Sequence, residues 1–167
     1  VAGYGGYGFH CPSQDLWDAY DADDPRLTYV FTHTGDRYAG DTQEQNNSVS
    51  PTGYHDYKMT VPAVDKIGWD VWLISYNIRF IRYADILLLY AEALNNKSGE
   101  ALIYLNEVRK RARETDPIDP RRDKQVYIPA TTPNSLPDIT TTNKDELRQR
   151  IWEERRRELA MEGWRRE

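Results

Sequence analysis

Aromatic and polar side chains gather in residues 35–76, a stretch whose beginning, up to Pro51, has the composition of a loop. Sixteen of the chain's twenty Tyr, Trp and Phe residues lie within the first ninety positions. Aromatic rings offer flat apolar faces to a ligand, while fixed polar side chains hydrogen-bond its polar groups. A single ring is more often a core residue, but a polar loop has little core in which to bury so many rings. Eight residues are therefore candidate ligand-binding residues: Asp36, Arg37, Tyr38, Tyr54, Tyr57, Trp69, Asp70 and Trp72.

The other reactive groups of the first half, five aspartates and a cysteine, match no catalytic or metal-binding motif. The aspartates lack the Asp-x-Asx-x-Asx-Gly pattern and the distal Glu of a calcium loop, so we expect solvated acids of a helix face and a turn. Cys11 follows His10 directly, a spacing that rarely joins a nucleophile to its base. We therefore expect no catalytic residue, no metal site and no cofactor. The aspartates are Asp15, Asp18, Asp21, Asp23 and Asp24.

Arginines near the end of the chain have the charge to contact phosphate, but glutamates interleave with them. Glu146 and Arg150 are four residues apart, as are Glu153 and Arg157, and this spacing favours ion pairs along one helix. We therefore expect an ion-paired helix that packs on its neighbour. The net charge of −5, with nine acids against three bases in residues 1–58, also argues against a nucleic-acid partner.

Length and hydropathy indicate one folded unit without a membrane-spanning helix. The chain has 167 residues, of which 39% are apolar, enough for a single core. Its longest apolar run, residues 86–91, is far shorter than the ~20 residues of a transmembrane helix. The first residues have neither the basic nor the apolar region of a signal peptide, and Cys11 lacks the context of a lipid-modified cysteine.

Local signals place a short helix and a strand in the first half. Ser13 is a suitable N-cap, and Leu16, Trp17 and Tyr20 fall on one helical face. The helix must end before Asp24-Pro25. Residues 27–31 are β-branched and aromatic, which predicts a short strand. We treat residues 1–77 as a loop-rich, aromatic-rich region that contains the ligand site.

From residue 78 the apolar period becomes helical. Residues 78–113 are predicted to form a hairpin of two antiparallel helices joined by a tight turn at Lys97-Ser98-Gly99. Prolines and threonines predict a long surface loop over residues 114–142. Asn143 and Glu146 resemble a capping box and Gly163 a C-cap, so the last helix is expected over residues 143–163. Residues 78–167 are therefore the predicted helical scaffold.

Three stretches, in this order, resemble the SusD/RagB family, and together they are specific although each alone occurs by chance. The first contains Gly8-Phe9, PSQDLWDAY at residues 12–20 and Asp24-Pro25-Arg26. The second is RYADILLLYAEALN at residues 82–95, followed by LNEVRKRA at residues 105–112. The third comprises Leu147, Ile151, Glu154-Arg155-Arg156, Glu158-Leu159 and Glu162-Gly163.

The resemblance implies a mainly α fold, in which tetratricopeptide-like helical hairpins carry irregular loops and a few short strands. It implies a non-catalytic lipoprotein at the surface of the outer membrane that binds oligosaccharides or other nutrients and has a SusC-like, TonB-dependent transporter as its partner. It covers the C-terminal portion of the family. We therefore expect a fragment of a larger superhelical fold, which lacks the N-terminal half and its lipid-anchored cysteine.

Two other classes of function remain open at this point. A glycoside-processing enzyme would use the same aromatic residues, with two carboxylates about 5 to 10 Å apart on either side of the scissile bond. A tetratricopeptide-like scaffold would bind another protein and no small ligand. The sequence names no particular glycan, and a peptide nutrient fits the same reasoning.

Two structural expectations follow from the helical half. Because one apolar stripe of the hairpin has no partner here, apolar side chains should form an exposed patch or be covered by another segment. Charges beside apolar faces are costly when unpaired, so at least one ion pair should join the helix around 82–95 to the helix around 144–162. The groups concerned are Arg82, Asp85, Glu92, Arg155 and Glu158.

Overall fold

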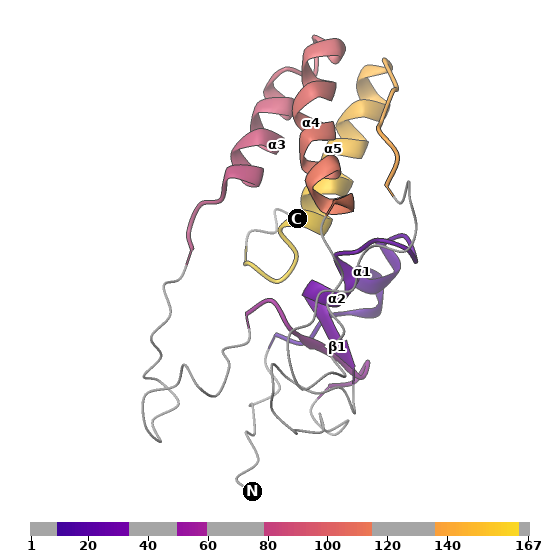
Figure 1. The fold of residues 1–167 in the computed structure, drawn as a ribbon, viewed down its shortest axis with the longest axis vertical. Helices are drawn as coiled ribbons and strands as arrows, with labels where there is room; N and C mark the ends of the chain where they lie inside the picture. Colours follow the sequence, from indigo (N-terminus) through magenta and orange to yellow (C-terminus); the bar gives the residue numbers. More distant parts are fainter. Residues whose placement is uncertain (1–9, 34–49, 60–78, 115–135, 164–167) are drawn as a thin grey trace, which may run out of the picture.

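Helices dominate the computed structural model, which describes residues 10–33, 50–59, 79–114 and 136–163 (Figure 1). The expected mainly α fold is confirmed. Three longer helices pack side by side, and two short helices and a two-stranded ladder lie near the C-terminal end of the last helix. In chain order the elements are α1 (Gln14–Asp18), α2 (Leu27–Val30), β1 (Phe31–His33), β2 (Tyr54–Asp56), α3 (Tyr83–Ala93), α4 (Ser98–Arg113) and α5 (Lys144–Glu158). No helix among these described segments is long and apolar enough to cross a membrane.

The predicted hairpin is formed by α3 and α4. The first helix is shorter than expected, because the chain is extended at Arg82 and becomes helical only at Tyr83. The second begins at Ser98, inside the predicted turn. Both helices pack against α5, since apolar residues recur every three or four positions on each of them. The shared core consists of Leu87, Leu88, Ala91, Ala101, Leu105, Val108, Leu147 and Ile151.

Helix α5 begins where the sequence predicted, but its caps differ. The Asn143 side chain accepts hydrogen bonds from the backbone N–H groups of Asp145 and Glu146, both 3.0 Å long. The reciprocal bond of a capping box is absent, because the Glu146 carboxylate instead accepts a 2.6 Å hydrogen bond from the Thr141 hydroxyl. The predicted C-cap at Gly163 is wrong. The helix ends at Glu158 with Leu159 as its C-cap, and turns follow up to Gly163.

The predicted strand over residues 27–31 is wrong in most of its length. Residues 27–30 form the short helix α2, and only Phe31 continues into strand β1. Asp24 causes this, because its side chain accepts a 2.9 Å hydrogen bond from the Arg26 N–H while its carbonyl accepts from the Leu27 N–H at 3.1 Å. These turn hydrogen bonds outweigh the β preference of the individual residues.

A second core cluster joins the N-terminal elements to the end of α5. It contains Tyr20, Val30 and Phe31 together with Ala160, which lies just beyond α5. As predicted, Leu16, Trp17 and Tyr20 come together in one cluster, but α1 ends at Asp18, so Tyr20 joins the cluster from beyond the helix. Strands β1 and β2 pair antiparallel beside it, with His33 opposite Tyr54 and Phe31 opposite Asp56.

Candidate functional site

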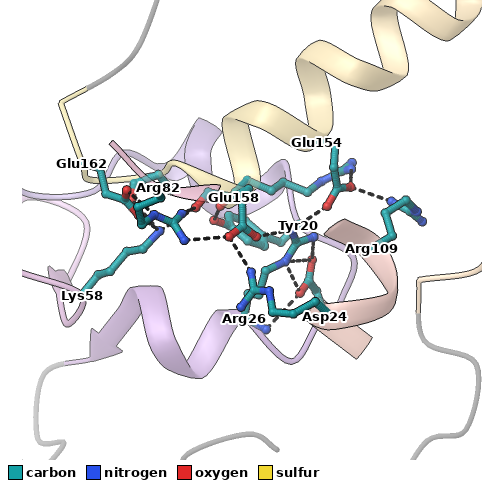
Figure 2. A network of polar contacts seen from close by, with 12 residues as sticks. Tyr20, Asp24, Arg26, Lys58, Arg82, Arg109, Glu154, Glu158 and Glu162 are labelled. Atoms are coloured by element: carbon teal, nitrogen blue, oxygen red, sulfur yellow. Dashed lines mark hydrogen bonds and ion pairs between the residues drawn. The ribbon is translucent and has the colours of Figure 1, made fainter. Parts of the chain in front are cut away.

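Helix α5 carries two glutamates into the interior, and these organise a buried ionic network (Figure 2). Glu154 is fully buried. It accepts a 2.6 Å hydrogen bond from Arg26 Nη1 and a 2.7 Å bond from Arg109 Nη1. A buried carboxylate is stable only when opposite charges and hydrogen bonds replace the lost water. Two arginines from distant parts of the chain meet this requirement.

Arg26 connects that glutamate to the turn before α2. Its Nε and Nη2 donate to the Asp24 carboxylate at 3.0 and 2.8 Å, a bidentate arrangement. Asp24 is only 2% exposed, so the expectation that it is a solvated turn acid is wrong. Burial by itself lowers the pKa of Arg26, but Glu154 and Asp24 outweigh burial and raise it, so this guanidinium stays charged. Burial also raises the pKa of the neighbouring Tyr20 hydroxyl.

Glu158, one helical turn further on, is shared by three arginines. Arg82 donates to it at 3.0 Å, Arg26 donates at 3.3 Å, and Arg111 forms a third ion pair. Burial by itself raises the pKa of Glu158, but the cations around it, led by Arg111, hold the pKa below its usual range. The carboxylate is therefore fully ionised at neutral pH.

Lys58 and Arg82 bind the backbone carbonyls at the C-terminal end of α5. Lys58 Nζ donates to the carbonyls of Glu158 and Ala160 at 2.6 and 3.3 Å and forms an ion pair with Glu162. Arg82 Nη2 donates to the same Glu158 carbonyl at 2.7 Å. The last carbonyls of a helix have no partner within it, so these cations satisfy acceptors that would otherwise stay unpaired. Burial lowers the pKa of Lys58 despite the attraction of Glu162.

The predicted ion pair between the helix around 82–95 and the last helix is confirmed. Asp85 on α3 and Arg155 on α5 lie 2.6 Å apart, oxygen to nitrogen. Arg82, just before α3, also reaches Glu158. Glu92 meets α5 differently, because it accepts a 2.9 Å hydrogen bond from the indole N–H of Trp152. Of the i, i+4 pairs expected along α5, Glu146 and Arg150 lie 3.8 Å apart, whereas Arg157 pairs with Glu154.

Chemically, this network is suited to holding elements together and unsuited to acid–base catalysis. A glycosidase general acid needs a carboxyl group whose pKa is raised towards neutrality. Glu158 has the opposite shift, and Glu154 is enclosed between Arg26 and Arg109. In the described segments, no group of three or more His, Cys, Asp or Glu side chains could hold a metal ion.

An aromatic cluster lies beside the network, where α1 packs on the strand ladder. The Trp17 and Tyr54 rings are stacked, with centroids 4.7 Å apart and planes 6° from parallel. His33 meets both rings edge-on, at 5.1 Å from Trp17 and 5.2 Å from Tyr54. Trp17 and Tyr54 are half-buried, whereas His33 is exposed. The cluster therefore combines a partly covered aromatic pair with a solvent-facing imidazole.

Polar groups on the same ladder add hydrogen-bonding capacity. Asp56 shares the face of β2 with Tyr54, because side chains two residues apart in a strand point the same way. Its carboxylate lies 3.4 Å from His10 Nδ1, and burial raises the pKa of Asp56 despite the nearby hydrogen-bond donors. His55 lies on the opposite face of the strand ladder. Burial and the neighbouring His33 lower the pKa of His55.

The ionic network fixes the position of the aromatic cluster. The Tyr20 hydroxyl donates to the Arg157 carbonyl, and Arg157 Nε donates to the Ala19 carbonyl, both at 2.6 Å. Arg156 also pairs with Asp15 on α1. Since Lys58 holds the chain after β2, both sides of the cluster are tied to the end of α5.

Two of the eight candidate ligand-binding residues fall within the described segments. Tyr54 lies in the aromatic cluster, and Tyr57 is half-buried after β2, with its N–H donating to the Val30 carbonyl at 3.0 Å. The other six, Asp36, Arg37, Tyr38, Trp69, Asp70 and Trp72, lie outside the described residues. Sequence reasoning missed Trp17 and His33 as neighbours of Tyr54, because strands of three residues are too short for alternation to show which side chains share a face.

The helical layer, the strand ladder and the buried arginine–glutamate network together define a mainly α scaffold. The chain belongs to the SusD family, whose model matches residues 2–167. It is 36% identical over 121 residues to SusD-like protein P38 of Formosa agariphila, an alignment that covers 71% of this chain and 21% of that protein. It is 29% identical over 168 residues to SusD-like protein P2 of the same organism, covering 94% of this chain and 30% of that protein. The chain thus spans less than a third of the length of either relative.

Proposed function

We propose that this chain belongs to a non-catalytic receptor that binds oligosaccharide nutrients at the cell surface and delivers them to a SusC-like, TonB-dependent outer-membrane transporter. The observation that carries the proposal is membership of the SusD family over residues 2–167. The receptor is lipid-anchored in the outer membrane through an N-terminal cysteine.

The ligand site of this receptor combines the aromatic cluster with the loop-like stretch of residues 35–76. Tyr54 belongs to both, and it stacks on Trp17. A sugar presents a C–H face to a ring and hydroxyl groups to its rim, so the His10–Asp56 pair and His33 are suitable hydrogen-bonding partners. The six candidates outside the described residues, among them Trp69 and Trp72, supply further contacts. No residue of the buried ionic network takes part in binding.

The absence of catalysis is supported by the state of the two interior glutamates. Arginines neutralise the negative charge of both, and the pKa of Glu158 is lowered. A receptor also gains from a network that keeps its aromatic rings in place, because rigid contacts bind with a smaller entropy cost.

A glycan-array screen of the full-length protein, followed by calorimetry with the best ligands, tests the proposal. We expect saturable binding of at least one oligosaccharide class and no shortened products when the same glycans are analysed by chromatography after incubation. Release of shorter sugars would indicate the glycoside-processing alternative. If the protein binds peptides and no glycan, its nutrient ligand is a peptide. Association with the transporter, which delivery requires, is tested by purifying the receptor from outer membranes and looking for the transporter in the same fraction. Membranes from cells that lack the transporter gene are the comparison.

A further inference from the structure

Two cations from separate parts of the chain meet at the C-terminal end of α5 (Figure 2). Lys58 follows strand β2, and Arg82 precedes helix α3. Lys58 Nζ and Arg82 Nη2 donate to the same oxygen, the Glu158 carbonyl, at 2.6 and 2.7 Å. Both cations also form ion pairs with the Glu162 carboxylate. We call Lys58, Arg82, Glu162 and the Glu158 carbonyl the cation clamp, which joins the ends of three separate elements.

The two cations of the clamp need an acid between them, because like charges at close range repel. The side chains of Lys58 and Arg82 are 23% and 21% exposed, so water screens the repulsion weakly. Burial lowers the pKa of Lys58, the positive charge of Arg82 lowers it further, and Glu162 raises it. The two cations therefore stay together while a carboxylate neutralises them.

Glu162 is better suited to this role than the carboxylate of Glu158. Glu158 pairs with Arg26 and Arg111 as well as with Arg82, so its charge is shared among three arginines. Within the segments that the structure describes, Glu162 pairs with the two cations of the clamp. Its side chain is 10% exposed, which strengthens both attractions.

The backbone after α5 brings Glu162 to this position. The helix ends at Glu158, and the N–H of Glu162 donates to the Leu159 carbonyl at 3.2 Å, which turns the chain back. Met161 has a φ of 63°, in the left-handed region that favours glycine. A residue with a side chain keeps such a conformation where the contacts around it fix the chain. The ion pairs of Glu162, the next residue, supply contacts of this kind.

We propose that Glu162 is a positioning residue of the ligand site, which holds strand β2 and the start of α3 at one point on α5. This inference rests on the proposed function, in which Tyr54 of β2 contacts the oligosaccharide. Glu162 does not touch the ligand, and it acts through Lys58, which lies four residues after Tyr54. Because one acid holds both cations, its loss should loosen both segments together.

Hydrogen exchange resolved to single amides in the full-length protein tests the clamp with Glu162→Gln, which removes the charge and keeps the shape. The Tyr57 amide reports on the ladder, because it donates to the Val30 carbonyl at 3.0 Å. The Asp85 amide reports on the start of α3, because it donates to the Arg82 carbonyl at 3.0 Å. We expect exchange at both amides to become about tenfold faster, since a charge-assisted contact is lost on each side. Amides of α4 should keep their rates.

Glu153→Gln is the matched control, because it removes the same charge from an exposed ion pair of α5 and should change neither amide. Faster exchange at only one of the two amides, or at neither, would overturn the shared clamp. If Glu162→Gln does not fold, Lys58→Met and Lys58→Arg replace it. Lys58→Met should accelerate the Tyr57 amide, and Lys58→Arg, which keeps the charge, should not. Equal rates in these two variants would also overturn the clamp.

Calorimetry with the best glycan tests the positioning role. Glu162→Gln should bind about threefold or more weakly than the parent, because affinity falls with the fraction of molecules that hold the site in its binding geometry. Lys58→Met should be weakened as well, with Lys58→Arg close to the parent. Unchanged affinity in Glu162→Gln, with both amides accelerated, would contradict the positioning role. A parent protein that binds no glycan refutes the proposed function, and hydrogen exchange still decides whether the clamp exists.

Discussion

Arg26 Nη1 and Glu154 Oε1 lie 2.6 Å apart although the two residues are separated by 128 positions in the sequence. Arg26 follows the turn that starts α2, and Glu154 lies in the middle of α5. Both are nearly or fully buried. This contact joins the turn before α2 to the last helix.

Glu154→Ala should lower the free energy of unfolding by about 3–5 kcal/mol, because it leaves Arg26 and Arg109 buried without their shared acid. Urea denaturation of the full-length protein measures the change. Glu153→Ala is the control, since Glu153 accepts exposed hydrogen bonds from Gln149 and Arg150, and its effect should stay within about 0.5 kcal/mol. Equal effects of the two variants would show that the buried network contributes no special stability.

The lowered pKa of Glu158 predicts a loss of stability in acid. The unfolded chain takes up a proton near the ordinary value of 4.5, whereas the folded chain resists protonation until a lower pH. The stabilising contribution is therefore complete above pH 4.5 and is lost as the pH falls through the folded-state pKa. Denaturation midpoints across this range should fall less steeply for Glu158→Gln than for the parent. Parallel curves would mean that Glu158 is not perturbed.

Arg82→Lys should destabilise the protein although it keeps the charge. Arg82 donates through three nitrogens to Glu158, its carbonyl and Glu162, and an ammonium group cannot reach these acceptors in the same geometry. A loss of about 1–3 kcal/mol in the free energy of unfolding is expected, the cost of leaving buried acceptors unpaired. Arg150→Lys, at an exposed ion pair, is the control. No difference between the two variants would refute a geometric role.

Trp69→Ala and Trp72→Ala, both outside the described residues, test the glycan site. On a helical turn the two rings would share a face, and on a strand they would point oppositely. Stacking of one ring on a sugar is worth about 1–3 kcal/mol, so at least one variant should weaken glycan binding roughly tenfold in calorimetry. Trp152→Ala, on α5, should bind as the parent does. If both variants match the parent, the binding site lies elsewhere in the full-length protein.

Asn143→Ala should destabilise α5 by about 0.5–2 kcal/mol, because the Asp145 and Glu146 N–H groups lose their acceptor. Thermal unfolding followed by circular dichroism gives the measurement. Lys144→Ala removes an exposed side chain from the next position and should have little effect. An unchanged midpoint for Asn143→Ala would show that water replaces the cap without cost.

The sequence determined the helices by itself, because the signals for a helix are local. Leu87, Ala91 and Leu105 recur at helical spacing, and Asn143 supplies a cap for the helix after it, so α3, α4 and α5 were predicted close to their observed positions. The pairing of α3 with α5 was also predictable in outline, since Asp85 and Arg155 both lie beside apolar stripes where an unpaired charge is costly.

Tertiary structure alone decided which acids are buried and which rings meet. In the sequence Asp24 resembles any turn aspartate, yet its carboxylate pairs with Arg26. Glu154 resembles the other charged residues of its helix, yet it too pairs with Arg26. The hydrogen bonds of Asp24 also turned residues 27–30 from an expected strand into α2. Trp17, His33 and Tyr54 converge from three separate elements. A local pattern contains no information on such contacts, because their energy exists only once distant segments have excluded water together.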